Sequence, residues 1–448
     1  MAALPLLVAL LLLRSCDGLA AATRVAWFRE CGCTGMEIEA AHLLGPLSQH
    51  AEVFTNSCAG KSCPGGTYGD AALDAAVAAI SVPEPQYWER VALEAEQCGA
   101  GGSKLNVVVH VGFLGACGVP DQLRGMQGKA GLRLIARSMY ETSRLPFGAS
   151  RLCNWYDHVV VPTMFNVRSY TESGVARSKL EVVHEGYNPA VWGCTSREEG
   201  RRRFAALRAG GSAGSGDKAG GGAQWTEVLD FVGRAHSSSA FLFISVFKWE
   251  ERKGWKELLT AFWRVHGSSA RLLIKTSRYA GAQPRAEAAA LARSLGMGAA
   301  AQRERLLIYE DCVGAAELAA LLAAADAFVL PTRGEGWGLT LLEAMATGLP
   351  VLSTAWGGAT EFLSAKNSLP LRFALVDAFG GHQVDDNGTV LQWARADGNE
   401  LVATMRRVEG WGEMGRSSIG KRACEDARRF THAKVAAELA ALLMGFRD

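Results

Sequence analysis

The sequence AFVLPTRGEGWGLTLLEAMAT, residues 327–347, decides the fold of this chain. Its first four residues are an apolar run of strand length, residues 331–337 form a glycine-rich turn, and residues 339–347 carry the pattern of a short helix. Amides in the first turn of a helix lack partners within the helix and lie at the positive end of its dipole, so they suit a diphosphate. Three glycines would let such a ligand approach the backbone: Gly334, Gly336 and Gly338.

Two glutamates belong to this stretch, Glu335 in the turn and Glu343 in the helix. Because Glu343 lies four residues past Leu339, it is displaced by roughly 6 Å along the axis from the start of the helix. One carboxylate can therefore reach a sugar while the other reaches a ribose. Glu343 has mostly apolar neighbours in sequence, and an ionised carboxylate in such surroundings needs polar partners such as ligand hydroxyls.

Each glutamate alone has a structural explanation. Glu343 could cap a neighbouring loop, and Glu335 could be a solvated turn residue. The spacing of the pair, the glycines, the Leu-Pro-Val segment 349–351 and the later Glu361 together favour a ligand site.

Short apolar runs alternate with helical segments along both halves of the chain. The runs are residues 24–28, 106–111, 132–136 and 158–162 in the first half, and 241–246, 271–275, 305–309, 327–330 and 351–354 in the second. This alternation is typical of parallel sheets that helices cover on both faces. It predicts an α/β protein with two doubly wound halves.

The 327–361 region resembles the donor-binding signature of retaining GT-B glycosyltransferases of the group 1, or family 4, type. The resemblance covers residues 240–446 well and residues 24–192 more loosely. It implies two Rossmann-like domains that face a central cleft, and transfer of a sugar, expected to be a hexose, from a UDP- or GDP-linked donor with retention of anomeric configuration. By the same resemblance, Glu335 would hold hydroxyls of the donor sugar, and Glu343 the ribose.

The family also holds the diphosphate with a basic pair in the loop after the first strand of the second half. Lys253 matches the second member of that pair, and Lys248 is the nearest match to the first, which is normally an arginine. A lysine supplies the charge but not the bidentate fork of an arginine. A solvated charged turn is the alternative reading of this loop. The remaining residues that the resemblance assigns to the donor are Gly336, Trp337, Gly338 and, near the base, Glu310.

Two residues of the first half are candidates for the catalytic side of the cleft. Glu141 follows a predicted strand and occupies roughly the place where many relatives carry a histidine near the reacting sugar. His110 ends the preceding strand. Either side chain could face the acceptor, although a histidine at a strand end is more often structural.

These features divide the chain into five segments. Residues 1–22 form a signal segment, residues 23–192 an acceptor-side domain, and residues 193–239 a glycine- and serine-rich linker or insertion that is predicted to be flexible. Residues 240–422 form the nucleotide-sugar-binding domain. The family resemblance implies that residues 423–448 contain a helix that crosses back to the first domain.

The signal segment is predicted from an apolar run at residues 2–13 followed by small residues suited to cleavage. A cleaved secretory signal peptide and a retained signal anchor both stay open, and both place the body in the lumen of the endoplasmic reticulum or Golgi, or outside the cell. Eight of the ten cysteines after Cys16 fall in the first half, where an oxidising compartment would permit disulfides, with free buried thiols as the alternative. The sequon at Asn387 would then be a glycosylation site.

The formal charge of +2 identifies no polyanionic partner, so nucleic-acid binding is not expected. No later segment reaches the roughly 20 apolar residues that a membrane span requires. The cysteine spacings do not match the usual zinc patterns, and no metal or cofactor is predicted beside the donor substrate. Two other functions stay open: a noncatalytic lumenal protein that binds a nucleotide sugar or a partner, and a phosphorylase or nucleotide-sugar hydrolase on the same fold.

Overall fold

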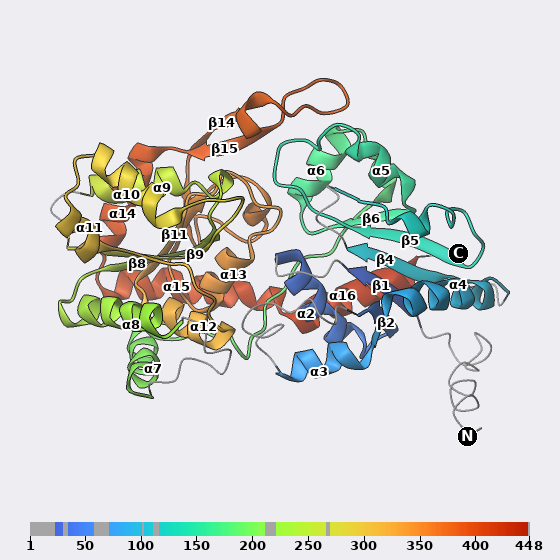
Figure 1. Ribbon diagram of the computed structural model, residues 1–448, viewed down its shortest axis with the longest axis horizontal. Coiled ribbons are helices and arrows are strands. Elements are labelled where there is room, and N and C mark those ends of the chain that lie inside the picture. The colour runs from blue at the N-terminus through green and yellow to red at the C-terminus, as the bar shows by residue number, and fades with distance from the viewer. Residues whose placement is uncertain are drawn as a thin grey trace.

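Figure 1 shows the structure, a computed structural model that describes residues 23–29, 35–57, 71–100, 103–110, 116–210, 221–265 and 269–446. Two α/β units lie side by side along the long axis of the molecule. The predicted signal segment and four of the first-half cysteines (Cys31, Cys33, Cys58 and Cys63) lie outside the described residues. None of the helices in the described part of the chain is both long and apolar enough to cross a membrane.

The N-terminal unit is built on a seven-stranded parallel sheet with the order β3-β2-β1-β4-β5-β6-β7. Its strands are β1 (Arg24–Arg29), β2 (Glu52–Asn56), β3 (Ser81–Val82), β4 (Leu105–His110), β5 (Leu132–Arg137), β6 (His158–Val161) and β7 (Leu180–Val182). Its helices are α2 (Gly35–Leu47), α3 (Ala71–Ala79), α4 (Glu84–Ala100), α5 (Ala149–Trp155) and α6 (Met164–Glu172). Every residue of β4 and β5 is buried, as expected for central strands that helices cover on both faces.

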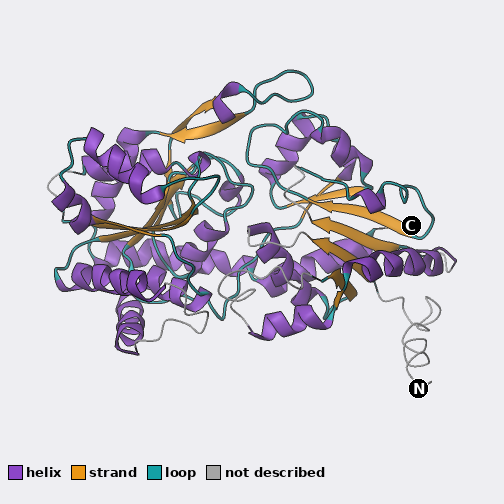
Figure 2. Cartoon of the chain, in the orientation of Figure 1, coloured by secondary structure: helices purple, strands orange, loops and turns teal. Residues whose placement is uncertain are grey.

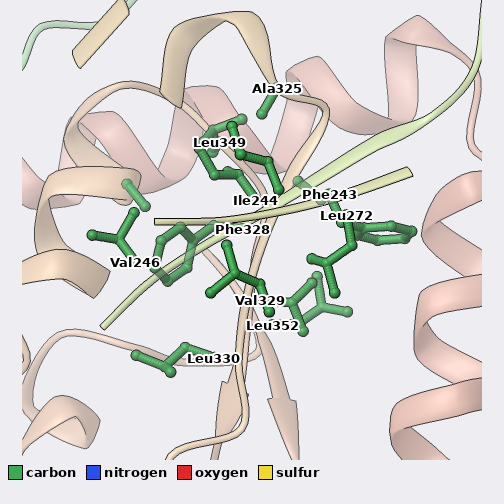
Figure 3. Close-up of a cluster of buried hydrophobic side chains, with 14 of the residues drawn as sticks. Phe243, Ile244, Val246, Leu272, Ala325, Phe328, Val329, Leu330, Leu349 and Leu352 are labelled. Atoms are coloured by element: carbon green, nitrogen blue, oxygen red, sulfur yellow. The ribbon is translucent and has the colours of Figure 1, made fainter. Parts of the chain in front are cut away.

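The C-terminal unit repeats this plan with a six-stranded parallel sheet of order β10-β9-β8-β11-β12-β13. Its strands are β8 (Leu242–Lys248), β9 (Arg271–Ser277), β10 (Leu306–Tyr309), β11 (Ala327–Leu330), β12 (Val351–Thr354) and β13 (Leu369–Leu371). Its helices are α9 (Trp255–Arg264), α10 (Pro284–Ser294), α11 (Ala299–Arg305), α12 (Ala315–Ala324), α13 (Leu339–Ala346), α14 (Gly398–Glu409) and α15 (Glu413–Ala427). Figure 3 shows Phe243, Ile244, Phe328 and Val329 of the two central strands within its apolar core.

The predicted fold class is confirmed, because both sheets are parallel and helices lie on both faces of each (Figure 2). The strand order of the C-terminal sheet reverses between β8 and β11. Ligands of doubly wound proteins bind beyond the carboxyl ends of the strands at such a switch point. The loops after β8 and β11 are therefore the place to look for a site.

The segment between the units differs from the flexible linker that the sequence analysis expected. Residues 193–239 contain two helices, α7 (Arg197–Gly210) and α8 (Gly221–Ser237). In α8, Trp225, Val228 and Val232 are buried against the C-terminal sheet, because their helical spacing places them on one face. The glycine-rich composition hid this apolar stripe. Only residues 211–220 of the segment lie outside the described residues.

The last helix, α16 (His432–Gly445), returns to the N-terminal unit. Its Val435, Leu439 and Leu443 belong to the same buried cluster as Val25 and Trp27 of β1. A short 3₁₀ helix, η6 (Arg428–Phe430), separates α16 from α15. The chain thus crosses between the units twice.

Two disulfides are present among the described residues. Cys117 and Cys153 join the loop after β4 to α5, and their Cα atoms are 5.0 Å apart. Cys194 and Cys424 join the segment before α7 to α15, with a Cα separation of 5.8 Å.

A hairpin that the sequence analysis did not anticipate bridges the two units. Strands β14 (Phe373–Asp377) and β15 (Gln392–Ala396) pair antiparallel, and Figure 1 shows the hairpin and its tip extending from the C-terminal unit toward α5. At the tip, the Asp386 carboxylate accepts hydrogen bonds from the Gly148 amide (2.7 Å) and the Ser150 hydroxyl (2.5 Å). The Phe147 amide donates to the Val384 carbonyl over 2.8 Å. We call residues 373–396 the arm.

We expect Asp386→Ala to lower the free energy of unfolding by about 1 kcal/mol, because two hydrogen bonds between the units are lost. Thermal unfolding of unglycosylated protein measures the effect. Asn387→Ala is the matched control, since the Asn387 side chain is exposed at the same tip. Equal stability of both variants would contradict the role of the arm.

Candidate active site

The loop between β11 and α13 meets the N-terminal unit directly. Gly338 immediately precedes α13 as its N-cap residue and has a φ of 105°, a left-handed conformation that favours glycine. A Cβ atom on Gly334 would lie 2.1 Å from the Glu141 carbonyl oxygen, and one on Gly336 would lie 2.6 Å from the Met139 sulfur. Two of the three glycines thus permit close contact with the first unit, in addition to any approach of a ligand.

Glu335 lies at the centre of a buried ionic cluster and is only 6% exposed. Its carboxylate accepts two hydrogen bonds from the Lys253 ammonium (2.8 and 2.9 Å), one from Arg252 (3.2 Å) and one from the Thr332 hydroxyl (2.8 Å). Burial raises the pKa of this carboxyl, but the two cations and the hydrogen bonds lower it by more, so the pKa lies below its ordinary value. Glu335 is therefore held ionised.

Arg252 is the residue of this cluster that the sequence analysis missed. It lies with Lys253 in the 3₁₀ helix η3 (Glu251–Lys253) after β8. Its guanidinium also donates to the Gly334 carbonyl (2.6 Å) and to Glu250 (2.7 Å), and it lies 3.4 Å from a Glu141 oxygen. The adjacent Arg-Lys pair was the only signal in the sequence.

Glu343 has the opposite environment although it belongs to the same segment. It lies on α13 beside buried apolar residues, and its carboxyl has no hydrogen-bond or ion-pair partner in the described part of the chain. Burial raises its pKa to about 8. A carboxyl group in this state is available to a ligand that offers hydroxyl groups.

Lys248 and Glu310 lie at the same edge of the C-terminal sheet but outside the Glu335 cluster. The Lys248 ammonium lies 4.4 Å from the centre of the Tyr279 ring. Glu310 follows β10 and pairs with Arg278 (2.6 Å) and more distantly with Arg285 (3.7 Å). Their assignment to the donor stays a prediction.

The Trp337 side chain is 1% exposed and packs on the interior side of the loop between β11 and α13. Its ring lies 4.9 Å from Phe362, 5.2 Å from Phe430 and 5.6 Å from His184, measured between ring centres. The indole therefore packs in the core beneath the loop, and a contact with the donor would have to come from the backbone of this residue.

The two catalytic candidates of the first unit occupy different environments. Glu141 follows β5, is partly exposed, and reaches Arg252 across the junction of the two units. His110 ends β4, is 2% exposed, and lies edge-on to Trp27 with ring centres 5.8 Å apart. The structure joins Glu141 to the Glu335 cluster and records no contact between His110 and that cluster within the described residues.

Glu361 forms a second ionic contact between the units. It accepts a hydrogen bond from the Met164 amide at the start of α6 (3.0 Å) and lies 3.7 Å from the His184 ring. On its other side His184 lies 3.4 Å from Glu438. Burial lowers the pKa of His184, but the two carboxylates raise it by more, to about 9.

A cavity of about 240 Å³ lies at the junction beside the Glu335 loop. Residues from both units line it: Ser143, Phe165, Arg168, Trp356, Gly357 and Thr360. Gly358 on the same loop as Trp356 donates its amide to the Glu335 carbonyl over 2.7 Å. The junction therefore has room for water molecules or a small ligand group beside the loop that carries Glu335.

Comparison with known proteins identifies the domain that carries this site. Residues 238–378 match the family model for glycosyl transferases group 1. A D-inositol 3-phosphate glycosyltransferase of Paenarthrobacter aurescens is 35% identical over 112 residues, which are 24% of this chain and 26% of the relative. A lipopolysaccharide core biosynthesis mannosyltransferase of Rhizobium meliloti is 56% identical over 41 residues, or 9% of this chain and 12% of the relative. The matched stretches thus span about a quarter or less of these two relatives.

Solved structures match the architecture over almost the whole chain. Anabaena HepE in complex with UDP and glucose has a TM-score of 0.63 at 13% identity, covering 95% of this chain and 100% of that one. Sucrose-phosphate synthase from Thermosynechococcus elongatus has a TM-score of 0.59 at 14% identity, covering 94% and 98%. At this level of identity the likeness concerns the fold, which is GT-B.

The raised pKa of Glu343 predicts a pH dependence of stability. Between the ordinary pKa of a glutamate and about pH 8, the folded protein retains a proton that the unfolded chain releases, so stability falls as the pH rises through this window. Glu343→Gln removes the titration. In urea unfolding, we expect its stability relative to the wild type to increase by roughly 3 kcal/mol between about pH 5 and about pH 8, at about 1.4 kcal/mol per pH unit. Parallel stability curves for the two proteins would contradict the assignment.

Proposed function

We propose that this protein, whose residues 238–378 carry a group 1 glycosyltransferase domain on a GT-B fold, transfers a sugar from a nucleotide diphosphate sugar to an acceptor. The observation that carries the proposal is the arrangement of Glu335, Lys253 and Glu343 around the first turn of α13. Glu335 is ionised and paired with cations, and the half-buried carboxyl group of Glu343 has no polar partner among the described residues. A nucleotide-sugar donor offers a diphosphate for the cation, ribose hydroxyls for Glu343 and sugar hydroxyls for Glu335.

In this proposal the diphosphate lies at the first turn of α13. Gly338 provides no side chain to cap this helix, so the Leu339 and Thr340 amides are suitably placed donors for phosphate oxygens. Lys253 adds a positive charge from the loop after β8. The ribose hydroxyls would bind Glu343 and replace the missing polar partners of its carboxyl. HepE was solved with UDP, which supports a UDP-linked donor, with GDP as the other nucleotide to be tested.

In this reaction the protein positions the substrates and stabilises the charge that develops on the leaving diphosphate. As the bond between the sugar and the diphosphate breaks, negative charge develops on the leaving diphosphate, and Lys253 and the α13 amides stabilise it. Glu335 orients the sugar through its hydroxyls, so that the acceptor meets the anomeric carbon in a fixed geometry. We propose retention of configuration and the family 4 subtype from the resemblance of the 327–361 segment. Glu141 is the residue of the first unit that we place nearest this reaction.

We also propose that the protein works in the secretory lumen. Two disulfides among the described residues suit an oxidising compartment. Asn387 is exposed in a turn at the tip of the arm, where the Asn387 and Thr389 amides both donate to Asp385, so its side chain is accessible to glycosylation. In a eukaryotic secretory host, we expect a glycosidase-sensitive increase in mass that Asn387→Gln abolishes. Cytosolic, unglycosylated protein would contradict this location.

The donor site is tested by nucleotide binding to residues 23–448. A ligand that binds only the native state must raise the apparent stability, so UDP, GDP and their sugar conjugates are compared by thermal unfolding. We expect one nucleotide class to stabilise the wild type, and Glu343→Ala to weaken its binding by about tenfold, the loss expected for one or two hydrogen bonds.

Glu304→Ala, an exposed change on α11, serves as the matched control and should bind like the wild type. The donor site would be contradicted if no nucleotide stabilised the wild type, or if both variants lost binding equally. Release of nucleoside diphosphate without any acceptor would instead favour a hydrolase, and dependence on inorganic phosphate a phosphorylase.

A further inference from the structure

We propose that Arg252 is a positioning residue that couples contact between the two units to the orientation of Glu335. This inference rests on the proposed function, because it assigns Glu335 to the donor sugar. Arg252 belongs to neither of the positions, Lys248 and Lys253, that the resemblance assigns to the diphosphate. Its role follows from its own contacts, those of its guanidinium first of all.

The two ends of the guanidinium have separate tasks. Nη1 donates to the Gly334 carbonyl (2.6 Å) and to Glu335 (3.2 Å), so it fixes the loop that carries the acid and the acid itself. Nη2 donates to Glu250 (2.7 Å) and lies 3.4 Å from the Glu141 carboxylate of the first unit. A planar fork can serve both directions at once, whereas the single ammonium of a lysine cannot.

The backbone of Arg252 strengthens the same connection. Its carbonyl accepts a hydrogen bond from the Arg333 amide over 2.6 Å, which joins the η3 turn directly to the loop after β11. Across the junction, Gly334 lies against the Glu141 carbonyl so closely that a side chain at this position would clash. The pairing of Glu141 with Arg252 therefore requires that the two units be in contact.

The charges of the cluster explain why a second cation is needed. Two cations, Arg252 and Lys253, face three carboxylates, Glu141, Glu250 and Glu335. Lys253 donates to both oxygens of Glu335, so it must give up at least part of this pairing when it turns to a diphosphate. Glu335 would then be a buried carboxylate without its closest cation. Arg252 remains to hold it ionised and correctly oriented toward the sugar.

The test separates sugar recognition from nucleotide recognition. Affinities of the wild type for UDP and UDP-glucose, and for GDP and GDP-mannose, are measured by calorimetry, and the pair that binds is used for the variants. We expect Arg252→Gln to bind the nucleoside diphosphate within about twofold of the wild type, while the extra affinity due to the sugar falls about tenfold, as for a lost charged hydrogen bond. Arg252→Lys should not restore it.

Glu141→Gln is a second variant. Because Glu141 is partly exposed, this substitution should disturb folding less than Arg252→Gln does. We expect a smaller loss of the sugar-dependent affinity, and no further loss when it is combined with Arg252→Gln, because both changes break the same link. Glu251→Gln, in the same turn but paired with Arg333, is the control and should behave as the wild type. A structural role alone would weaken nucleotide and nucleotide sugar alike.

The outcomes distinguish this inference from the proposed function. If the wild type binds neither nucleotide pair, the proposed function fails and the role of Arg252 with it. If the wild type gains affinity from the sugar and Arg252→Gln or Arg252→Lys keeps that gain in full, only the positioning role is overturned. Additive losses in the double variant would overturn the coupling to Glu141.

Discussion

The site depends on one constraint: a carboxylate that is 6% exposed must be surrounded by cations and hydrogen-bond donors to stay ionised. Glu335 meets this constraint with Lys253, Arg252 and Thr332, which come from two separate loops of the C-terminal sheet. The pairing locks the loop after β8 to the loop after β11 at the switch point of the strand order. Through Arg252 the same cluster extends to Glu141, so the position of the acid also depends on the neighbouring unit.

Two glutamates of one short segment acquire opposite properties from their surroundings. The pKa of Glu335 is lowered by its cations, and the pKa of Glu343 is raised to about 8 by burial. Divergent environments of this kind separate the tasks of two acidic groups in one site. The environment of Glu335 favours its ionised form, whereas the carboxyl group of Glu343 has no polar partner among the described residues.

Much of the fold and part of the site could be predicted from sequence, because they depend on local patterns. The apolar runs gave the central strands, and the spacing of glycines and glutamates in residues 327–347 gave the loop and α13. Arg252 could not be found, since its role arises from contacts with Gly334 and Glu141, distant in sequence. The arm was missed because most of β14 is exposed and offers no buried alternation. The helix α8 was missed because the prediction relied on the glycine-rich composition of the segment. The helical spacing of Trp225, Val228 and Val232 could have indicated it.

The most direct test of a donor bound around the first turn of α13 is amide hydrogen exchange on the wild type, with and without the nucleotide sugar that stabilises it most. The account predicts slower exchange in residues 336–342 and in the turn 251–254, because phosphate oxygens accept from the free amides and hold Lys253. Protection confined to segments away from β8 and α13, at saturating ligand, would contradict it.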